Sequence, residues 1–343
     1  MYYIRKSKLF LFLAAVAIIF LLSCQPDRKN EKTEPISITL AASTYIGSAP
    51  IFVAKEKGFF LDQGLAVTLI VNDAGVESLT DLKESRAHMA MVAELPIVYS
   101  YFDKYKYTDE KWEDLVIIAD MVLSNNISRI LTRRDRGIEK PEDLRGKTIA
   151  VPKGTSIDYL LDLFLLTHGI ERSEIIIIDK DVRSQVEAIV YGDVDAIFSW
   201  QPHIAQAIEL LDSEAYLMPL NLFYHNAWLA VTLREFALAN AHVLESFLKA
   251  LLQAEQFMSR YPAQAISIHA QYSNLSPDVI AHSWKDILFE VNLGEALLTT
   301  MEDEARWVMG RHESARLNLP DFLSLIHFEP MLKVKPHGVT IIQ

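Results

Sequence analysis

Short apolar runs alternate with amphipathic stretches from residue 36 onward. The segment Ile36–Leu40 alternates apolar and polar positions, which is typical of a half-buried strand. The helix expected over 50–57 has Pro50 in its first turn and Gly58 just after its end, both common at helix boundaries. The same reasoning predicts a short helix over 78–83 and strands over 65–71, 89–92 and 116–121.

The cycle starts again near residue 148, which indicates a second lobe of similar build. Aligning Ser78 with Ser184 also aligns Ala90 with Ala196 and Pro96 with Pro202. Strand–helix alternation in both copies predicts two mainly parallel sheets with right-handed crossovers. In the second copy we expect strands over 148–151, 175–178 and 195–198, and helices over 157–167, 184–191 and 202–211.

The pattern changes to helices after residue 218. We expect this C-terminal third to pack back on the first lobe, whereas the tail from Lys333 has little pattern of its own. A strand over 227–233 precedes helices expected over 241–260, 262–272, 277–285 and 293–308.

The N-terminus has the pattern of a signal peptide. Three basic residues precede the apolar run Leu9–Leu22, which is shorter than the roughly 20 residues of a membrane-spanning helix. The run ends in Leu21-Leu22-Ser23-Cys24, which resembles the bacterial lipobox, whose cysteine is acylated. We therefore expect a lipoprotein signal peptide over 1–23, lipid on Cys24, and a polar tether over 24–35.

Composition and motif content restrict the function. The formal net charge of −12 argues against nucleic acid as a partner. Cys24 is the only cysteine, so no disulfide forms within one chain. The sequence has no GxGxxG, GxSxG or HExxH motif, and His312-Glu313 lacks the second histidine of a zinc site. We expect no enzymatic activity, no cofactor and no metal.

Candidate binding residues occur where predicted strands end and helices begin. In open α/β sheets ligands bind at the carboxyl ends of strands, and helix N-termini there offer unpaired N–H groups to an anion. Four loops, two from each lobe, satisfy this rule. Their candidate ligand-binding residues are Ser43, Thr44, Tyr45, Gly47, Ser48, Glu94, Lys153, Gly154, Thr155, Ser156, Trp200 and Gln201.

Several of these residues have two interpretations. Small hydroxyl residues and glycines at helix starts often only cap the helix. Tyr45 and Trp200 could hold an apolar part of a ligand or belong to the core. Glu94 could pair with a ligand ammonium or be a surface acid. His225, Asn226 and Trp228, near the expected return to the first lobe, are weaker candidates.

Three segments resemble the family of ABC-transporter substrate-binding proteins for nitrate, taurine and aliphatic sulfonates, which also contains thiamine-pyrimidine binders. They are Ala49–Phe60 followed by Gly64-Leu65, Asp143–Ser156, and Gly192–His203. The resemblance implies a type II periplasmic-binding-protein fold: two α/β lobes, joined by two crossing strands, that close on a ligand. It places lobe one at 36–121 and 224–343, and lobe two at 122–223.

The expected function is a monomeric, lipid-anchored receptor in the cell envelope, on its periplasmic or extracytoplasmic face. It would deliver a small anionic or zwitterionic solute, such as a sulfonate, taurine or nitrate, to an ABC permease and its ATPase. A thiamine-precursor pyrimidine binder and a sensory receptor on this scaffold stay open as alternatives. Related enzymes of pyrimidine synthesis depend on a cysteine- and histidine-rich segment, which a chain with Cys24 alone cannot supply.

Overall fold

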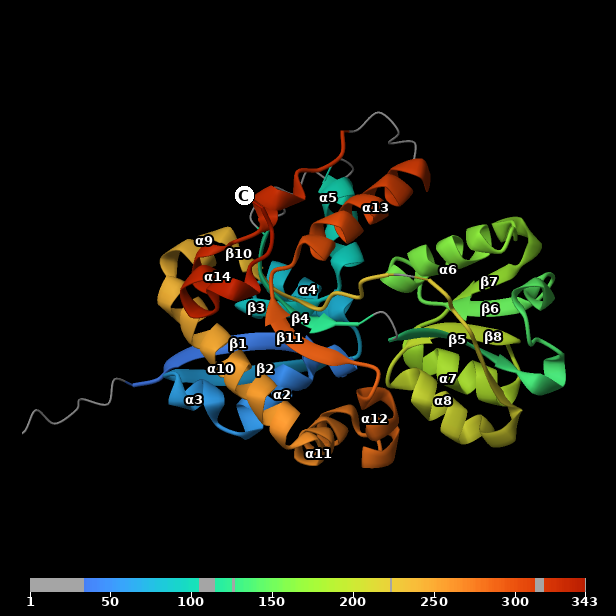
Figure 1. The fold of residues 1–343 in the computed structure, drawn as a ribbon, viewed down its shortest axis with the longest axis horizontal. Helices are drawn as coiled ribbons and strands as arrows, with labels where there is room; N and C mark the ends of the chain where they lie inside the picture. Colours follow the sequence, from blue (N-terminus) through green and yellow to red (C-terminus); the bar gives the residue numbers. More distant parts are fainter. Residues whose placement is uncertain (1–33, 105–114, 125–126, 223, 312–317, 343) are drawn as a thin grey trace, which may run out of the picture. The chain divides into compact units, whose positions relative to one another are not determined.

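The computed structural model describes residues 34–104, 115–124, 127–222, 224–311 and 318–342 (Figure 1). The folded body starts at Ile36, where the first strand was predicted. In the described residues it contains two mixed sheets, so the prediction of mainly parallel sheets is wrong. The first holds β1 (Ile36–Ser43), β2 (Leu65–Asn72), β3 (Met89–Val92), β4 (Leu115–Leu123), β10 (Leu229–Leu233) and β11 (Leu288–Asn292). The second holds β5 (Ser128–Arg133), β6 (Thr148–Val151), β7 (Ile176–Asp179), β8 (Ala196–Trp200) and β9 (Ala215–Met218). Strands β10, β4 and β11 in the first sheet and β5 and β9 in the second pair antiparallel with their neighbours.

The two sheets share a strand order, as the internal repeat predicts. The first runs β11-β4-β10-β3-β1-β2 and the second β9-β5-β8-β6-β7. In each, the first two strands of the repeat are parallel, and the third is parallel to the first. Ala90 pairs with Ala41 of β1 and Ala196 with Ile149 of β6, so the aligned alanines occupy corresponding strands.

Thirteen α-helices are described, most of them close to their predicted bounds. They are α2 (Ala49–Glu56), α3 (Phe59–Asp62), α4 (Gly75–Lys83), α5 (Glu94–Lys104), α6 (Ser156–Thr167), α7 (Val182–Tyr191), α8 (His203–Leu211), α9 (Arg234–Ala239), α10 (Ala241–Arg260), α11 (Pro262–Ser273), α12 (Pro277–Trp284), α13 (Glu295–Arg311) and α14 (Glu329–Val334). None of the described helices has the length and apolar content needed to cross a bilayer.

Alternation along the strands gives the second sheet a core on each face. On β6, Ile149 and Val151 belong to the cluster packed under α6, whereas Ala150 joins the cluster of α7 and α8. On β8, Phe198 and Ile197 divide in the same way. Because strand side chains alternate between faces, short apolar runs fill both layers at once.

The C-terminal helices pack around the elements of the first sheet. Helix α10 packs on α2 and α3, and α13 packs on α5. Val243, Phe247, Leu251 and Met258 of α10 are fully buried and recur at helical spacing. This stripe joins the single large core that surrounds the first sheet.

The chain crosses between the lobes twice, from β4 to β5 and from β9 to β10. The crossings contact each other, since Asn226 N donates to Ser124 O over 2.9 Å. Seven of the described helices and strands were not predicted: α3, α5, α9, α14, β5, β9 and β11. Helices α3, α9 and α14 have only four to six residues each. Helix α5 has Pro96 in its first turn, where proline is tolerated, and the strands are short with charged or mixed residues that hide their alternation.

Candidate functional site

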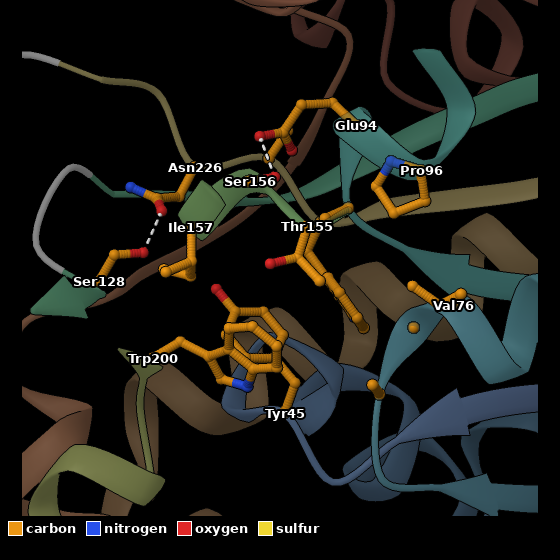
Figure 2. Close-up of a pocket in the computed structure, with 15 residues that line it drawn as sticks. Tyr45, Val76, Glu94, Pro96, Ser128, Thr155, Ser156, Ile157, Trp200 and Asn226 are labelled. Atoms are coloured by element: carbon orange, nitrogen blue, oxygen red, sulfur yellow. Dashed lines mark hydrogen bonds between the residues drawn. The ribbon is translucent and has the colours of Figure 1, made fainter. Parts of the chain in front are cut away.

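A pocket lies where elements of both lobes meet (Figure 2). It has a free volume of about 60 Å³, room for roughly four water molecules. Its lining is largely apolar, and of the described residues that line it none is Lys, Arg or His. The lining residues are Tyr45, Ala74, Gly75, Val76, Ala93, Glu94, Pro96, Ser128, Thr155, Ser156, Ile157, Trp200, Asn226, Ala227 and Trp228.

Three helix N-termini contribute to this lining. Helix α4 begins at Gly75, α5 at Glu94 and α6 at Ser156, and all three residues line the pocket. The first N–H groups of a helix have no partner within it, and they give that end a partial positive charge. The pocket therefore offers backbone N–H groups to an anion, although no cationic side chain lines it among the described residues.

Three aromatic side chains form one wall. The ring centroids of Tyr45 and Trp228 are 4.4 Å apart, and Tyr45 meets Trp200 edge-on at 6.5 Å. Trp228 is held from behind, because its Nε1 donates to Ser48 Oγ over 3.0 Å in a buried position. In Figure 2 the Tyr45 hydroxyl points toward Thr155 and Ile157 across the pocket.

Two glycines allow Trp228 its position. A Cβ on Gly75 would lie 2.7 Å from the Trp228 ring and 3.0 Å from the backbone of Val92. A Cβ on Gly47 would lie 2.9 Å from the other part of that ring and 2.4 Å from the ring of Tyr45. The aromatic wall thus packs directly on backbone, which only glycine permits at this distance.

A buried group of acids lies beside the pocket. Glu94 and Glu304 are 1% and 0% exposed, and both contact the hydroxyl of Tyr224. The distance from Tyr224 Oη to Glu304 Oε1 is 2.7 Å, and Ser156 Oγ donates to Glu94 Oε1 over 3.1 Å (Figure 2). Burial raises the pKa of Glu94, and burial together with the charge of Glu94 raises the pKa of Glu304.

A histidine–aspartate pair stands next to these acids. His225 Nε2 lies 2.8 Å from Asp120 Oδ2, and Asp120 Oδ1 accepts from the backbone N–H of Trp228. Burial opposes the charged imidazolium, but the hydrogen bond and charge of Asp120 prevail and raise the pKa of His225. This pair fixes the start of the return strand and hence the place of Trp228.

Among the described residues that line the pocket, two fully buried side-chain atoms have no hydrogen-bond partner: Trp200 Nε1, a donor, and Glu94 Oε2, an acceptor. Buried polar atoms are ordinarily paired, so both invite a ligand. The described residues contain no group of three or more His, Cys, Asp or Glu side chains suited to a metal ion.

Five of the predicted site residues line the pocket: Tyr45, Glu94, Thr155, Ser156 and Trp200. The other seven do not: Ser43, Thr44, Gly47, Ser48, Lys153, Gly154 and Gln201.

Those seven side chains have other places in the structure. Ser43 Oγ accepts from the N–H of Tyr45, and Gly47 and Ser48 support the aromatic wall from behind. Gln201 Oε1 accepts from Ser283 Oγ and from a backbone N–H in α8. Thr44 is buried and lines a separate pocket, Gly154 has a positive φ, and Lys153 is exposed. A binding role for any of these residues stays a prediction.

Sequence reasoning missed one part of the site and gave another too little weight. Residues 74–76 also follow a strand end, β2, and so satisfy the rule that selected the other loops. Asn226 and Trp228 were ranked as weak candidates because no motif distinguishes the return crossing. Tyr224 and Glu304 had no sequence signal, since α13 reaches the site only through the fold.

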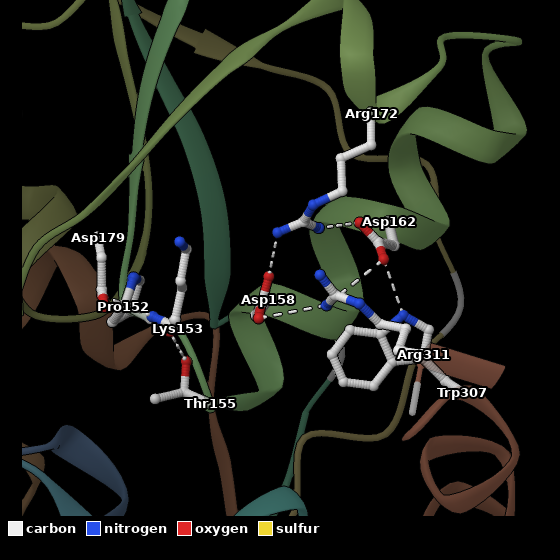
Figure 3. A network of polar contacts seen from close by, with 9 residues as sticks. All are labelled: Pro152, Lys153, Thr155, Asp158, Asp162, Arg172, Asp179, Trp307 and Arg311. Atoms are coloured by element: carbon white, nitrogen blue, oxygen red, sulfur yellow. Dashed lines mark hydrogen bonds and ion pairs between the residues drawn. The ribbon is translucent and has the colours of Figure 1, made fainter. Parts of the chain in front are cut away.

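A second polar cluster joins α6 to α13 (Figure 3). Asp158 and Asp162 of α6 both pair with Arg172, the first over 2.7 Å. Arg311 of α13 approaches Asp158 to 3.4 Å, and Trp307 Nε1 donates to Asp162 Oδ2 over 2.9 Å. We call these five residues the α6–α13 cluster; it lies on elements of different lobes.

Comparisons with known proteins agree with this architecture. A family profile described as NMT1/THI5 like matches residues 46–265. A Bacillus subtilis (strain 168) protein assigned to aliphatic sulfonate binding is 22% identical over 281 residues, covering 79% of this chain and 80% of that protein. The taurine-binding periplasmic protein of Escherichia coli (strain K12) is 24% identical, covering 66% of this chain and 67% of that protein.

A solved structure shares the fold. The periplasmic aliphatic sulphonate binding protein SsuA from Escherichia coli superposes with a TM-score of 0.70 at 19% identity, covering 85% of this chain and 96% of that chain. The predicted two-lobed periplasmic-binding-protein fold is therefore confirmed. At this identity the likeness concerns the fold alone.

Proposed function

Since this chain belongs to the NMT1/THI5 like family, we propose that it is an extracytoplasmic solute-binding receptor of an ABC importer. It binds a small anionic or zwitterionic solute in the pocket between its lobes and has no catalytic role. The lobes, with the proposed bounds 36–121 plus 224–343 and 122–223, close on that solute. A permease and an ATPase receive it, and lipid on Cys24, which lies outside the described residues, anchors the receptor.

The convergence of three helix N-termini on one pocket carries the proposal. They come from both lobes, so a ligand held there would join the lobes through its own contacts. Oxyanions suit such a site because backbone N–H groups reach them without a charged side chain. The names of the two relatives, for sulfonate and taurine binding, point to the same class of solute.

The size of the pocket favours a compact solute. A free volume of about 60 Å³ holds only a few heavy atoms, since a water molecule takes roughly 10–15 Å³ by this measure. The aromatic wall of Tyr45, Trp200 and Trp228 would cover the apolar part of the solute. Short-chain sulfonates satisfy both conditions, whereas nitrate satisfies only the first.

Calorimetric titration of the purified full chain tests this function. The panel is methanesulfonate, ethanesulfonate, taurine, nitrate and an aminopyrimidine. We expect saturable binding of at least one of the small anions or zwitterions, with a change in tryptophan fluorescence because Trp200 and Trp228 line the pocket.

Replacing Trp200 by Ala should weaken that binding about tenfold or more, the loss of about 1.4 kcal/mol. Trp284→Phe is the matched control, since Trp284 lies in α12 and lines a different pocket. If the aminopyrimidine is the only compound that binds, the solute is a pyrimidine and not a small anion or zwitterion. Failure of the whole panel to bind would overturn the function proposed.

A further inference from the structure

The buried acids share one hydroxyl in a way that restricts their protons. Tyr224 Oη contacts both Glu94 Oε1 and Glu304 Oε1. A tyrosine hydroxyl carries one hydrogen and donates it to one acceptor. The second contact is a hydrogen bond only if that carboxyl donates its own hydrogen to Tyr224 Oη. At least one of the two glutamates is therefore protonated in this arrangement.

The surroundings contain little positive charge to replace that proton. On the return crossing, His225 faces Glu94 but is paired with Asp120 of β4. On α13, Asp303 adds negative charge near Glu304.

Tyrosines supply the other titratable groups near these acids. Tyr45 after β1, Tyr99 of α5 and Tyr159 of α6 all face them, and burial raises the pKa of each. The arginines on this side, Arg172 and Arg311, are engaged by Asp158.

We propose that the solute is a zwitterion whose ammonium group binds Glu94 and releases the proton that Glu94 and Glu304 share. This inference rests on the proposed function and specifies its solute. The unpaired Glu94 Oε2 is the acceptor for the ammonium, and the unpaired Trp200 Nε1 with the helix N-termini serves the oxyanion.

The exchange is balanced. In the free site the pair holds one proton and carries one negative charge. The incoming ammonium forms hydrogen bonds to the Glu94 carboxylate, and the displaced proton goes to bulk water. The positive charge of the ammonium takes the place of the released proton. It offsets the repulsion between the Glu94 and Glu304 carboxylates, as the proton did in the free site. A solute with an oxyanion and no cation offers no such replacement and meets the charge of the pair.

The choice of solute is tested with a matched pair of compounds, taurine and isethionate, which differ only by an ammonium in place of a hydroxyl. Titration calorimetry in buffers of different ionisation enthalpy counts the protons exchanged. For taurine we expect release of about one proton. Its affinity should then increase with rising pH, by up to about tenfold per pH unit, until the pH reaches the pKa of the pair. Isethionate should bind at least about tenfold more weakly and release none.

A second measurement needs no ligand. Carbon-13 NMR of labelled glutamate carboxyls in the free full chain should show one carboxyl that stays protonated well above the usual glutamate range. In Glu304→Gln the amide N–H can donate to Tyr224 Oη in place of the shared proton. That variant should lose the abnormal titration of Glu304, while Glu94 keeps a pKa raised by its burial, and it should release fewer protons when taurine binds. Glu302→Gln, an exposed change on the same helix, should leave both unchanged.

The outcomes separate the two proposals. Equal affinity for isethionate and taurine without proton release would overturn the zwitterion while leaving the receptor function intact. Tight binding of nitrate or methanesulfonate with no binding of taurine would do the same. If every glutamate in the free chain titrates in the usual range, Glu94 and Glu304 do not share a proton. If none of the compounds of this test or of the first panel binds, the receptor function itself is overturned.

Discussion

At the level of single residues, the pocket depends on a glycine, because a Cβ at that position would collide with its surroundings. Gly75 opens α4 and lies between the Trp228 ring and the backbone of β3. Its sequence neighbourhood contains no motif, and the reason for a glycine there becomes visible only when Trp228, far along the chain, is in place. Trp228 cannot move aside freely because Ser48 and Asp120 hold its indole and its backbone.

Replacing Gly75 by Ala should therefore damage the pocket. The added methyl meets a ring at 2.7 Å and backbone at 3.0 Å, and overpacking of this kind costs about 1–3 kcal/mol. We expect the dissociation constant for the solute to rise about tenfold or more in calorimetric titration, with a lower midpoint of urea unfolding.

Gly310→Ala is the matched control for that change. Gly310 lies in α13, and no described atom outside its own stretch of helix comes within 4 Å of its added Cβ, so alanine should stabilise the helix by up to about 1 kcal/mol. Unchanged affinity in Gly75→Ala would show that Trp228 does not shape the binding pocket.

At the scale of elements, hydrophobic period and boundary residues predicted most helices and strands. The strands β3 and β6 have the bounds expected from their apolar runs, and α10 has the bounds expected from its long amphipathic stripe. Helix α5 was missed because its residues ELPIVYSYFDK mix aromatic and polar positions without a clear helical period. Its stability comes from packing against α13, which local sequence does not show.

The α6–α13 cluster connects elements that are remote in sequence. Asp158 and Asp162 are spaced one turn apart on α6, so both carboxylates face the same side. Arg172 and Arg311 neutralise them, and Arg311 also lies 4.7 Å from the centre of the Trp307 ring. Because α6 packs on the second sheet and α13 packs on α5 beside the first, this cluster connects the two sheets' surroundings, and we expect it to favour the arrangement in which both line the pocket.

Asp162→Asn should weaken that connection. It removes charge facing Arg172 and Arg311, and loss of one partner in a half-buried ion pair costs about 1–2 kcal/mol after discounting for solvent. We expect a dissociation constant raised about fivefold or more, with less dependence on ionic strength than in the unaltered chain.

Glu302→Gln serves as the control, because Glu302 pairs with Arg306 of the same helix and with no member of the α6–α13 cluster. Equal affinity of the Asp162 variant and the unaltered chain at low ionic strength would show that the cluster does not contribute to the closed arrangement.

At the scale of the whole molecule, the rule that ligands meet strand ends correctly selected the region of the pocket. Tyr45, Glu94, Thr155, Ser156 and Trp200, predicted from four separate loops, do line one cavity. The buried acid pair was beyond sequence reasoning, because Glu304 lies in a helix whose polar positions all suit a solvated face. Only the return of the C-terminal helices to the first lobe brings it to Tyr224.

The N-terminal prediction concerns the whole molecule as well, because it decides where the protein is located. Residues 1–33 lie outside the described part of the chain, so the lipobox interpretation rests on sequence. Cys24→Ala should abolish incorporation of labelled palmitate in bacterial cells, since no other cysteine can accept the lipid. Ser7→Ala, a change in the basic region, should keep the label. Persistent labelling of Cys24→Ala would refute the anchor.

The strand order of the first sheet governs how an incomplete chain behaves. Strand β10 lies between β3 and β4, although 105 residues of sequence, Ser124–Trp228, separate it from β4. A polypeptide that stops before β10 can form the second sheet, which is built from one continuous stretch, but leaves bare edges on β3 and β4. Those edges stay open to pairing with other chains until the last third of the protein has been synthesised.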